Sequence, residues 1–135
     1  MDREEVLAKA KMDFQFLQQR ALGTLVFGSW ARGEASERSD IDLCIVAPRA
    51  SDPGALWREA LSNIQDSRYE VRIFELLPLY MKMAVIEGGV VVCSRDVLEL
   101  YEYFYPFRRL WEDQKRRQTV SREEMREILG ASMSK

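Results

Sequence analysis

Residues 25–47, with the sequence LVFGSWARGEASERSDIDLCIVA, decide how this chain folds. The stretch begins and ends with apolar runs, LVF and LCIVA, that have the length and the β-branched content of buried strands. Gly28 and Ser29 follow the first run directly. Ten residues separate Ser29 from Asp40, and Asp40 and Asp42 stand at the start of the second run. The stretch therefore predicts a tight turn at the end of one strand and an acidic pair at the start of the next.

The acidic pair is suited to a divalent metal ion. Side chains alternate between the faces of a strand, so Asp40 and Asp42 share one face while Ile41 points into the core. Neighbouring carboxylates repel unless a cation lies between them, and Mg²⁺ takes oxygen ligands while it keeps positions open for phosphate oxygens. Because Gly28 lacks a Cβ atom, a triphosphate can approach its backbone, and Ser29 offers an N–H and a hydroxyl. The stretch indicates metal-bound nucleotide chemistry.

The same stretch resembles the signature of a known family. Residues 28–43 follow the pattern GSxARGxxxxxSDIDL, which is similar to that of the minimal nucleotidyltransferases (MNT) of the DNA polymerase β superfamily. The resemblance extends from about residue 5 to about residue 95 and implies an α/β fold, a small mixed sheet with packed helices. It also implies transfer of a nucleoside monophosphate, most often AMP from Mg-ATP, to an acceptor hydroxyl with release of pyrophosphate.

The resemblance also implies roles for individual residues. Asp40 and Asp42 would hold two Mg²⁺ ions, and Gly28 and Ser29 would hold the β- and γ-phosphates. Arg32 follows the turn and has two interpretations. Its guanidinium contacts phosphate oxygens, or it forms an ion pair with an acidic neighbour, for which the candidates are Glu34, Glu37 and Asp40.

The third carboxylate departs from the family pattern. The family has Asp in the third strand, where this chain has Glu70. Glutamate also ligates divalent cations and could accept the hydroxyl proton, but its extra methylene moves the oxygens by about 1 Å, which can cost about a hundredfold in rate. The alternative is a surface residue paired with Arg72 or Arg68, and Glu75 lies on the opposite face of the strand. Both interpretations of Glu70 stay open.

Composition excludes several classes of protein. The 135 residues predict one domain with a single core, and the net charge of −2 argues against a protein that coats polyanions. The chain has no histidine, which excludes Ser-His-Asp hydrolases, His-based zinc sites and His-dependent ribonucleases. Cys44 and Cys93 lie in apolar segments and are expected to be buried reduced thiols. Short apolar runs and a charged first segment predict a cytoplasmic location without a membrane span.

The apolar periodicity predicts one small α/β domain over residues 1–95 and a helical extension over 96–135 packed on the same domain. The expected strands are 24–27, 40–47, 68–76 and 90–93, and the expected helices are 3–20, a short one within 28–35, 55–65, 79–87, 96–117 and, after a capping box at Ser121 and Glu124, one ending at Leu129.

The extension carries six aromatic residues on more than one helical face, which favours a protein interface: Tyr101, Tyr103, Phe104, Tyr105, Phe107 and Trp111. A second copy of the chain is compatible with such an interface. So is a HEPN-type toxin, because small proteins that resemble MNT are often antitoxins of HEPN ribonucleases, and some adenylylate a toxin tyrosine. The basic residues of this segment are interrupted by Glu112 and Asp113, so no nucleic-acid partner is expected.

Two alternatives to a protein-modifying enzyme stay open. One is transfer to a small molecule such as an aminoglycoside, against which the absence of a second, substrate-binding domain argues. The other is a partner-binding antitoxin module, catalytically weak because its nucleotide site is degenerate at Glu70. Consumption of ATP in the presence of Mg²⁺ and a partner separates these classes.

Overall fold

The structure, a computed structural model, describes residues 1–133, apart from the side chains at 118–122, 128 and 130–133. Its strands are β1 (Gly23–Phe27), β2 (Ile41–Val46), β3 (Tyr69–Ile73) and β4 (Val90–Ser94). They form one sheet in the order β3-β2-β1-β4, in which β1 pairs antiparallel with β2 and β4, and β2 pairs parallel with β3. The expected small mixed sheet is confirmed.

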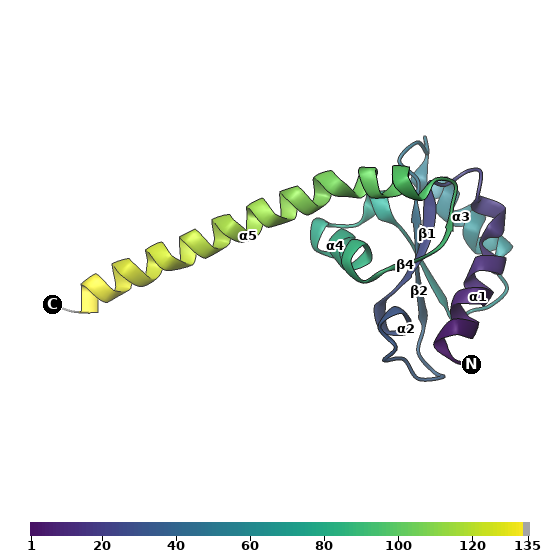
Figure 1. The fold of residues 1–135 in the computed structure, drawn as a ribbon, viewed down its shortest axis with the longest axis horizontal. Coiled ribbons are helices and arrows are strands. Elements are labelled where there is room, and N and C mark those ends of the chain that lie inside the picture. The colour runs from purple at the N-terminus through teal and green to yellow at the C-terminus, as the bar shows by residue number, and fades with distance from the viewer. Residues whose placement is uncertain (134–135) are drawn as a thin grey trace.

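The helices cover both faces of this sheet. They are α1 (Arg3–Asp13), α2 (Gly28–Arg32), α3 (Pro53–Asn63), α4 (Leu79–Gly88) and α5 (Val97–Met133). Figure 1 shows α1 and α3 on one face, α4 and the beginning of α5 on the other, and α2 at one end of the sheet. In the part of the chain that the structure describes, no helix is long and apolar enough to cross a membrane.

Alternation along β2 builds a core on each face. Ile41, Leu43 and Ile45 are buried in a cluster with residues of α1 and α3. Cys44 and Val46 are buried in a second cluster with residues of α4 and α5. The half-buried Asp42 shares the face of Cys44, at the end of β2 where this second cluster stops. The sheet therefore presents Asp42 at the margin of the α4–α5 face.

Two expected elements end earlier than the sequence predicted. α1 ends at Asp13, and the expected helical segment up to residue 20 continues as a tighter turn, because the N–H groups of Leu17 and Gln18 donate to carbonyls three residues back. β3 ends at Ile73, and another such turn covers residues 74–76. Both cysteines are free thiols; Cys44 is buried as expected, whereas Cys93 on the edge strand β4 is only partly buried.

α5 corrects the expectation of two C-terminal helices, because it is a single helix from Val97 to Met133. Residues 107–129 contain no glycine or proline, so nothing in their backbone chemistry stops the helix before Ser121. The side chain that the expected capping box needs at Ser121 lies outside the described residues. The division of the chain at residue 95 stays a prediction.

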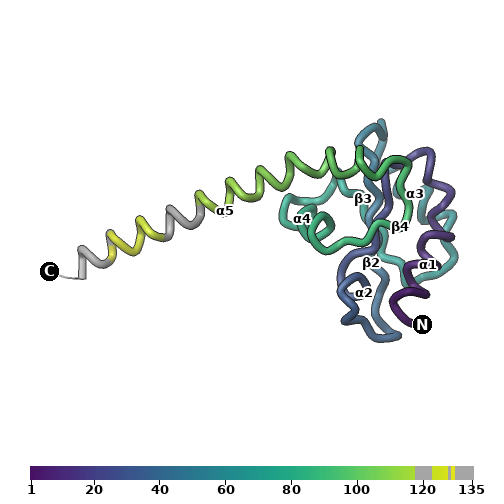
Figure 2. Tube along the Cα trace, in the orientation of Figure 1, coloured from purple at the N-terminus to yellow at the C-terminus, as the bar shows by residue number. Residues whose placement is uncertain are grey.

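Only the first part of α5 packs on the sheet. Leu100 and Phe104 are buried, and Tyr103, Phe107 and Trp111 pack partly against the same cluster. Beyond Trp111, the described side chains are exposed, and the helix projects away from the rest of the molecule (Figure 1, Figure 2). The expected packing of the extension on the domain therefore holds for its first part.

Candidate functional site

Gly28 joins β1 to α2 in a conformation that suits glycine alone. Its φ angle is +72°, and a Cβ atom built there would overlap the carboxylate oxygen Oδ2 of Asp42. The contact arises because Phe27, the last residue of β1, pairs with Asp42 in the antiparallel register. The missing side chain of Gly28 thus creates the space that the Asp42 carboxylate occupies.

Asp42 faces a second acidic residue across the sheet. In the parallel register of β2 and β3 its partner is Glu70, on a strand about 4.8 Å away. Burial raises the pKa of the Asp42 carboxyl, and the negative charges of Glu70 and Asp40 raise it further. The positive charge of Arg72 acts in the opposite direction. The sheet brings like charges together, which is the arrangement that a bound cation relieves.

The donor chemistry of these carboxylates fits Mg²⁺. Asp42 and Glu70 are directly opposite one another, and Asp40 lies just before β2, exposed but close enough for its charge to act on Asp42. Among the described side chains, no group of three or more Cys, Asp or Glu residues is arranged to hold a metal ion. The structure therefore brings two of the three predicted ligands together and leaves Asp40 beside them.

The Glu70 carboxylate is already engaged by an arginine. Its Oε1 atom lies 2.6 Å from Nη2 of Arg72, and the side chains are 47% and 38% exposed. This is one of the ion pairs that the alternative interpretation of Glu70 named. The other candidate, Arg68, pairs with Asp66 at 2.9 Å. Arg72 follows Glu70 by two residues along β3, so both side chains lie on the same face of the strand.

The remaining predicted residues lie around the turn. Ser29 is half-buried at the start of α2, next to Gly28. Arg32 is exposed, and its Nε atom lies 2.9 Å from Oε2 of Glu34, so its guanidinium forms one of the expected ion pairs. Trp30 is buried and its Nε1 donates to the carbonyl of Ser39 at 3.2 Å. That bond fixes the end of the loop that delivers Asp40, a role that the sequence did not reveal.

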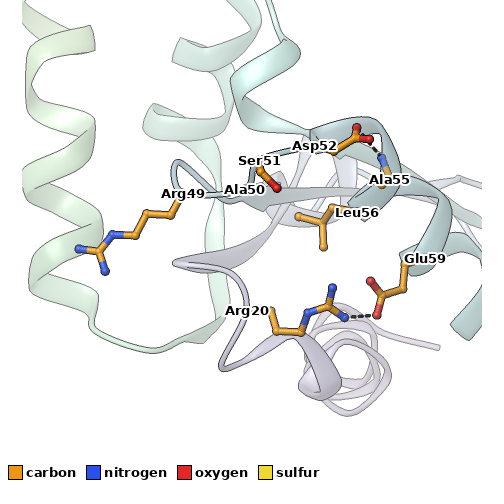
Figure 3. A pocket seen from close by; sticks show the side chains of 8 residues that line it. All are labelled: Arg20, Arg49, Ala50, Ser51, Asp52, Ala55, Leu56 and Glu59. Carbon is orange, nitrogen blue, oxygen red and sulfur yellow. Dashed lines mark hydrogen bonds and ion pairs between the residues drawn. The ribbon is translucent and has the colours of Figure 1, made fainter.

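A separate pocket of about 410 Å³ lies at the opposite end of β2, beside the first turn of α3 (Figure 3). Its two arginines are engaged, Arg20 with Glu59 and Arg49 with Glu99. The pocket lies past the last residue of β2, whereas Asp42 is near the first. It therefore has no part in the acidic site. The residues that line it are Arg20, Arg49, Ala50, Ser51, Asp52, Ala55, Leu56 and Glu59.

Comparison with known proteins finds similarity over most of the chain. The family model "Polymerase beta, Nucleotidyltransferase" matches residues 8–97, which include every predicted site residue. Over 98 residues the chain is 40% identical to the protein named "Putative protein adenylyltransferase MJ1547" of Methanocaldococcus jannaschii. The match covers 73% of this chain and 75% of that protein.

Solved structures share the fold at low sequence identity. A toxin–antitoxin structure with AMP-PNP has a TM-score of 0.66 and 18% identity, with coverage of 88% of this chain and 98% of that one. A complex of tri-AMPylated Shewanella oneidensis HEPN toxin with MNT antitoxin has a TM-score of 0.61 and 16% identity, with coverage of 91% and 98%. These similarities show the polymerase β-like α/β fold.

Proposed function

The chain belongs to the polymerase β nucleotidyltransferase family, and from this premise we propose that it transfers AMP from Mg-ATP to a hydroxyl group of a protein partner. The acceptor we propose is a tyrosine of a HEPN-type toxin, which gives the chain an antitoxin role. The placement of Asp42 opposite Glu70, directly beneath the missing side chain of Gly28, carries the proposal. It puts an acidic pair beside the turn from β1 to α2, where Ser29 offers an N–H and a hydroxyl to phosphate oxygens.

The acidic residues and the residues of the turn have roles in this reaction; Arg32 pairs with Glu34 and takes no part in it. Asp40, Asp42 and Glu70 would hold two Mg²⁺ ions, which, when bound, supply positive charge to the triphosphate and to the developing negative charge. Ser29 donates its N–H and hydroxyl to phosphate oxygens beside Gly28. The acceptor oxygen forms a bond to the α-phosphorus while the bond to the bridging oxygen breaks and pyrophosphate leaves. Glu70 accepts the proton of the hydroxyl.

A protein acceptor is favoured by what the relatives are called and by α5. The M. jannaschii relative is named an adenylyltransferase of proteins, and a structural neighbour is an antitoxin with an AMPylated toxin. In this chain, Leu98, Tyr101 and Tyr105 are between 54% and 74% exposed, at spacings that put them on one face of α5. Exposed aromatic side chains of this kind favour protein interfaces.

The transfer reaction can be tested directly. Purified protein is incubated with ATP labelled at the α-phosphate, Mg²⁺ and a HEPN-type protein encoded beside it. We expect label on the toxin, one pyrophosphate released for each AMP transferred, and loss of both signals in chelator. Pyrophosphate release without labelled protein would point to a different acceptor, and absence of both signals with Mg²⁺ present would contradict the proposed reaction.

Glu70→Gln is expected to lower the transfer rate by about a hundredfold or more, because the amide keeps the shape of the side chain but removes the charge that binds the metal ion. Glu70→Asp is expected to retain or raise the rate, because it restores the side chain that the family has. The initial rate of AMP transfer measures both effects. Equal rates for the parent and both variants would make Glu70 an ordinary surface residue.

The ion pair between Glu70 and Arg72 also favours a second candidate function, a partner-binding module that does not catalyse transfer. A module of this kind binds the toxin with equal affinity in Mg-ATP and in chelator. Pull-down under both conditions, together with the labelling assay, separates it from an enzyme.

Tyr101→Ala combined with Tyr105→Ala is expected to weaken partner binding by at least about tenfold without unfolding the protein, because both rings are more than half exposed. Trp111, in contrast, packs partly against the α4–α5 core, with Nζ of Lys115 5.4 Å from its ring centroid. Sedimentation of the chain, alone and with the toxin, measures assembly. Gln114→Ala is the control on the same helix, because Gln114 is exposed and lies two and a half turns after Tyr105, on the opposite face. Unchanged assembly of the double variant would exclude this face as the interface.

A further inference from the structure

Arg72 is a positively charged residue in contact with the acidic pair, and neither the family signature nor the comparisons give it a role. We propose that its guanidinium is an internal counter-ion, which neutralises Asp42 and Glu70 in the metal-free protein and releases Glu70 when a divalent cation binds. The second half of this inference rests on the proposed function, because it takes Asp42 and Glu70 as metal ligands. The first half concerns the metal-free protein alone.

The register of the sheet places Arg72 beside both carboxylates. It follows Glu70 by two residues on β3, so the two side chains share the face of the sheet that carries Asp42. Its partner across β2 is Cys44, two residues after Asp42. From this position its Nη2 atom reaches Oε1 of Glu70 at 2.6 Å, a charge-assisted contact of short length.

The charge of Arg72 also acts on Asp42. Asp42 is the register partner of Glu70, and Arg72 contacts Glu70 from the same face of the sheet, so its positive charge lies beside both carboxylates. The nearest arginine along the strand, Arg68, forms its ion pair with Asp66 instead. One guanidinium therefore serves two carboxylates that belong to different strands.

The ion pair occupies one of the candidate ligand atoms. Oε1 of Glu70 contacts Arg72, and among the described side chains the carboxylates of Asp40, Asp42 and Glu70 do not form a group arranged to hold a metal ion. A divalent cation at this site competes with the guanidinium for the same oxygen. Because the Arg72 side chain is 38% exposed, it can move into solvent when the cation binds. The competition is modest, since partly exposed ion pairs change an equilibrium by a factor of about two to five.

The competition can be measured with Mn²⁺ by electron paramagnetic resonance, without nucleotide and without turnover. Arg72→Gln is expected to bind Mn²⁺ about two- to fivefold more tightly than the parent chain, because no guanidinium has to be displaced. Arg72→Lys keeps the charge and is expected to stay near the parent. Arg68→Gln is the matched control, since it removes an arginine that pairs elsewhere, and its affinity is expected to be unchanged. If Arg72→Gln binds Mn²⁺ as tightly as the parent chain or more weakly, the proposed competition is overturned.

A double-mutant cycle tests the counter-ion role in the absence of any metal. We expect Arg72→Gln to lower the equilibrium constant for folding by a factor of about two to five, measured by urea denaturation in chelator. The same substitution in an Asp42→Asn background is expected to have a smaller effect, because part of the repulsion that Arg72 relieves is gone. Additive effects of the two substitutions overturn the counter-ion role.

The two measurements separate the failure of this inference from the failure of the proposed function. If Asp42→Asn binds Mn²⁺ as the parent does, the metal site is not at Asp42, and both the proposed chemistry and the competition are overturned. The cycle in chelator still decides the counter-ion role in that case. If Mn²⁺ binding depends on Asp42 but is the same with and without Arg72, the metal site stands and the competition alone is wrong.

Discussion

Asp42→Asn is expected to lower the rate of AMP transfer by about a thousandfold and to leave the fold intact. The amide keeps the size of the side chain but removes the charge that binds the metal ions, which supply several kcal/mol of transition-state stabilisation in reactions of this class. Labelled-AMP transfer gives the rate, and calorimetry with Mg-ATP and with ATP in chelator gives the metal-dependent part of binding. Asp113→Asn, an exposed acid paired with Arg116 on α5, is the control and is expected to change neither.

The effect of Asp42→Asn on stability is expected to be opposite in sign to the effect of the same substitution at an acid that forms a stabilising ion pair. Because burial and the charge of Glu70 raise the pKa of Asp42, the folded state holds the proton more tightly than the unfolded state does. Stability from this group is therefore present at low pH and is lost as the pH rises through the folded-state pKa. In the metal-free protein at about pH 7, we expect the variant to be at least as stable as the parent.

Urea denaturation in chelator checks this sign. As the pH falls from neutral towards the usual pKa of an aspartate, the parent should gain stability relative to Asp42→Asn, because protonation of Asp42 relieves the repulsion that the variant lacks at every pH. A variant that is much less stable than the parent at neutral pH would mean that Asp42 holds the fold together. Its loss of activity would then give no information about metal binding.

Strand periodicity predicted the face on which Asp42 lies, although β2 begins at Ile41 and leaves Asp40, expected within the strand, just before it. Alternation along a strand put Asp42 on one face with its apolar neighbours on the other, and the structure has that alternation in β2. The absence of a Cβ atom at Gly28 suggested a close approach to the backbone. The structure shows such an approach, but from the Asp42 carboxylate across the β1–β2 pair. Which phosphate or metal the residues bind stays a prediction.

The position of Glu70 opposite Asp42 could not be predicted from periodicity. It depends on the parallel pairing of β2 with β3, a contact between segments separated by the whole of α3, and periodicity gives no register between distant strands. The family resemblance pointed to Glu70 but not to the residue that pairs with it. An arginine side chain can reach several partners, so the sequence alone did not decide whether Arg72 pairs with Glu70. Only the coordinates distinguish Arg72 from Arg68 as the partner of Glu70.

The length of α5 was missed for a different reason. The predicted break rested on a capping box at Ser121 and Glu124. The same pattern also occurs inside a helix when no helix-ending residue precedes it. Residues 119–121 are Thr, Val and Ser, and the Glu, Gln, Lys and Arg residues of good helix propensity on both sides of them continue the helix through this position. The consequence for function is geometric, since one continuous helix carries its exposed side chains well beyond the sheet (Figure 1).

Gly28→Ala is expected to be the most damaging single substitution at the turn, and Gly33→Ala is its matched control. The two glycines flank α2 with φ angles of +72° and +75°, so an added methyl group meets the same backbone strain at both, roughly 1–2 kcal/mol. At Gly33 the new Cβ atom would have no heavy atom within 4 Å, whereas at Gly28 it would overlap Oδ2 of Asp42. The difference between the variants isolates the contact with the carboxylate.

We therefore expect Gly28→Ala to be less stable than Gly33→Ala by a further 1–3 kcal/mol or so, measured by urea denaturation. Because displacement of a catalytic group by about 1 Å can cost about a hundredfold in rate, transfer should fall by that order in Gly28→Ala and stay near the parent rate in Gly33→Ala. Addition of Asp42→Ala to Gly28→Ala should restore the stability lost to the overlap, but neither the part lost to backbone strain nor the activity, since it removes the overlap together with the metal ligand. If both glycine variants lose equal stability and keep transfer, Asp42 does not lie against residue 28 in the folded protein, and the acidic site has to be placed elsewhere.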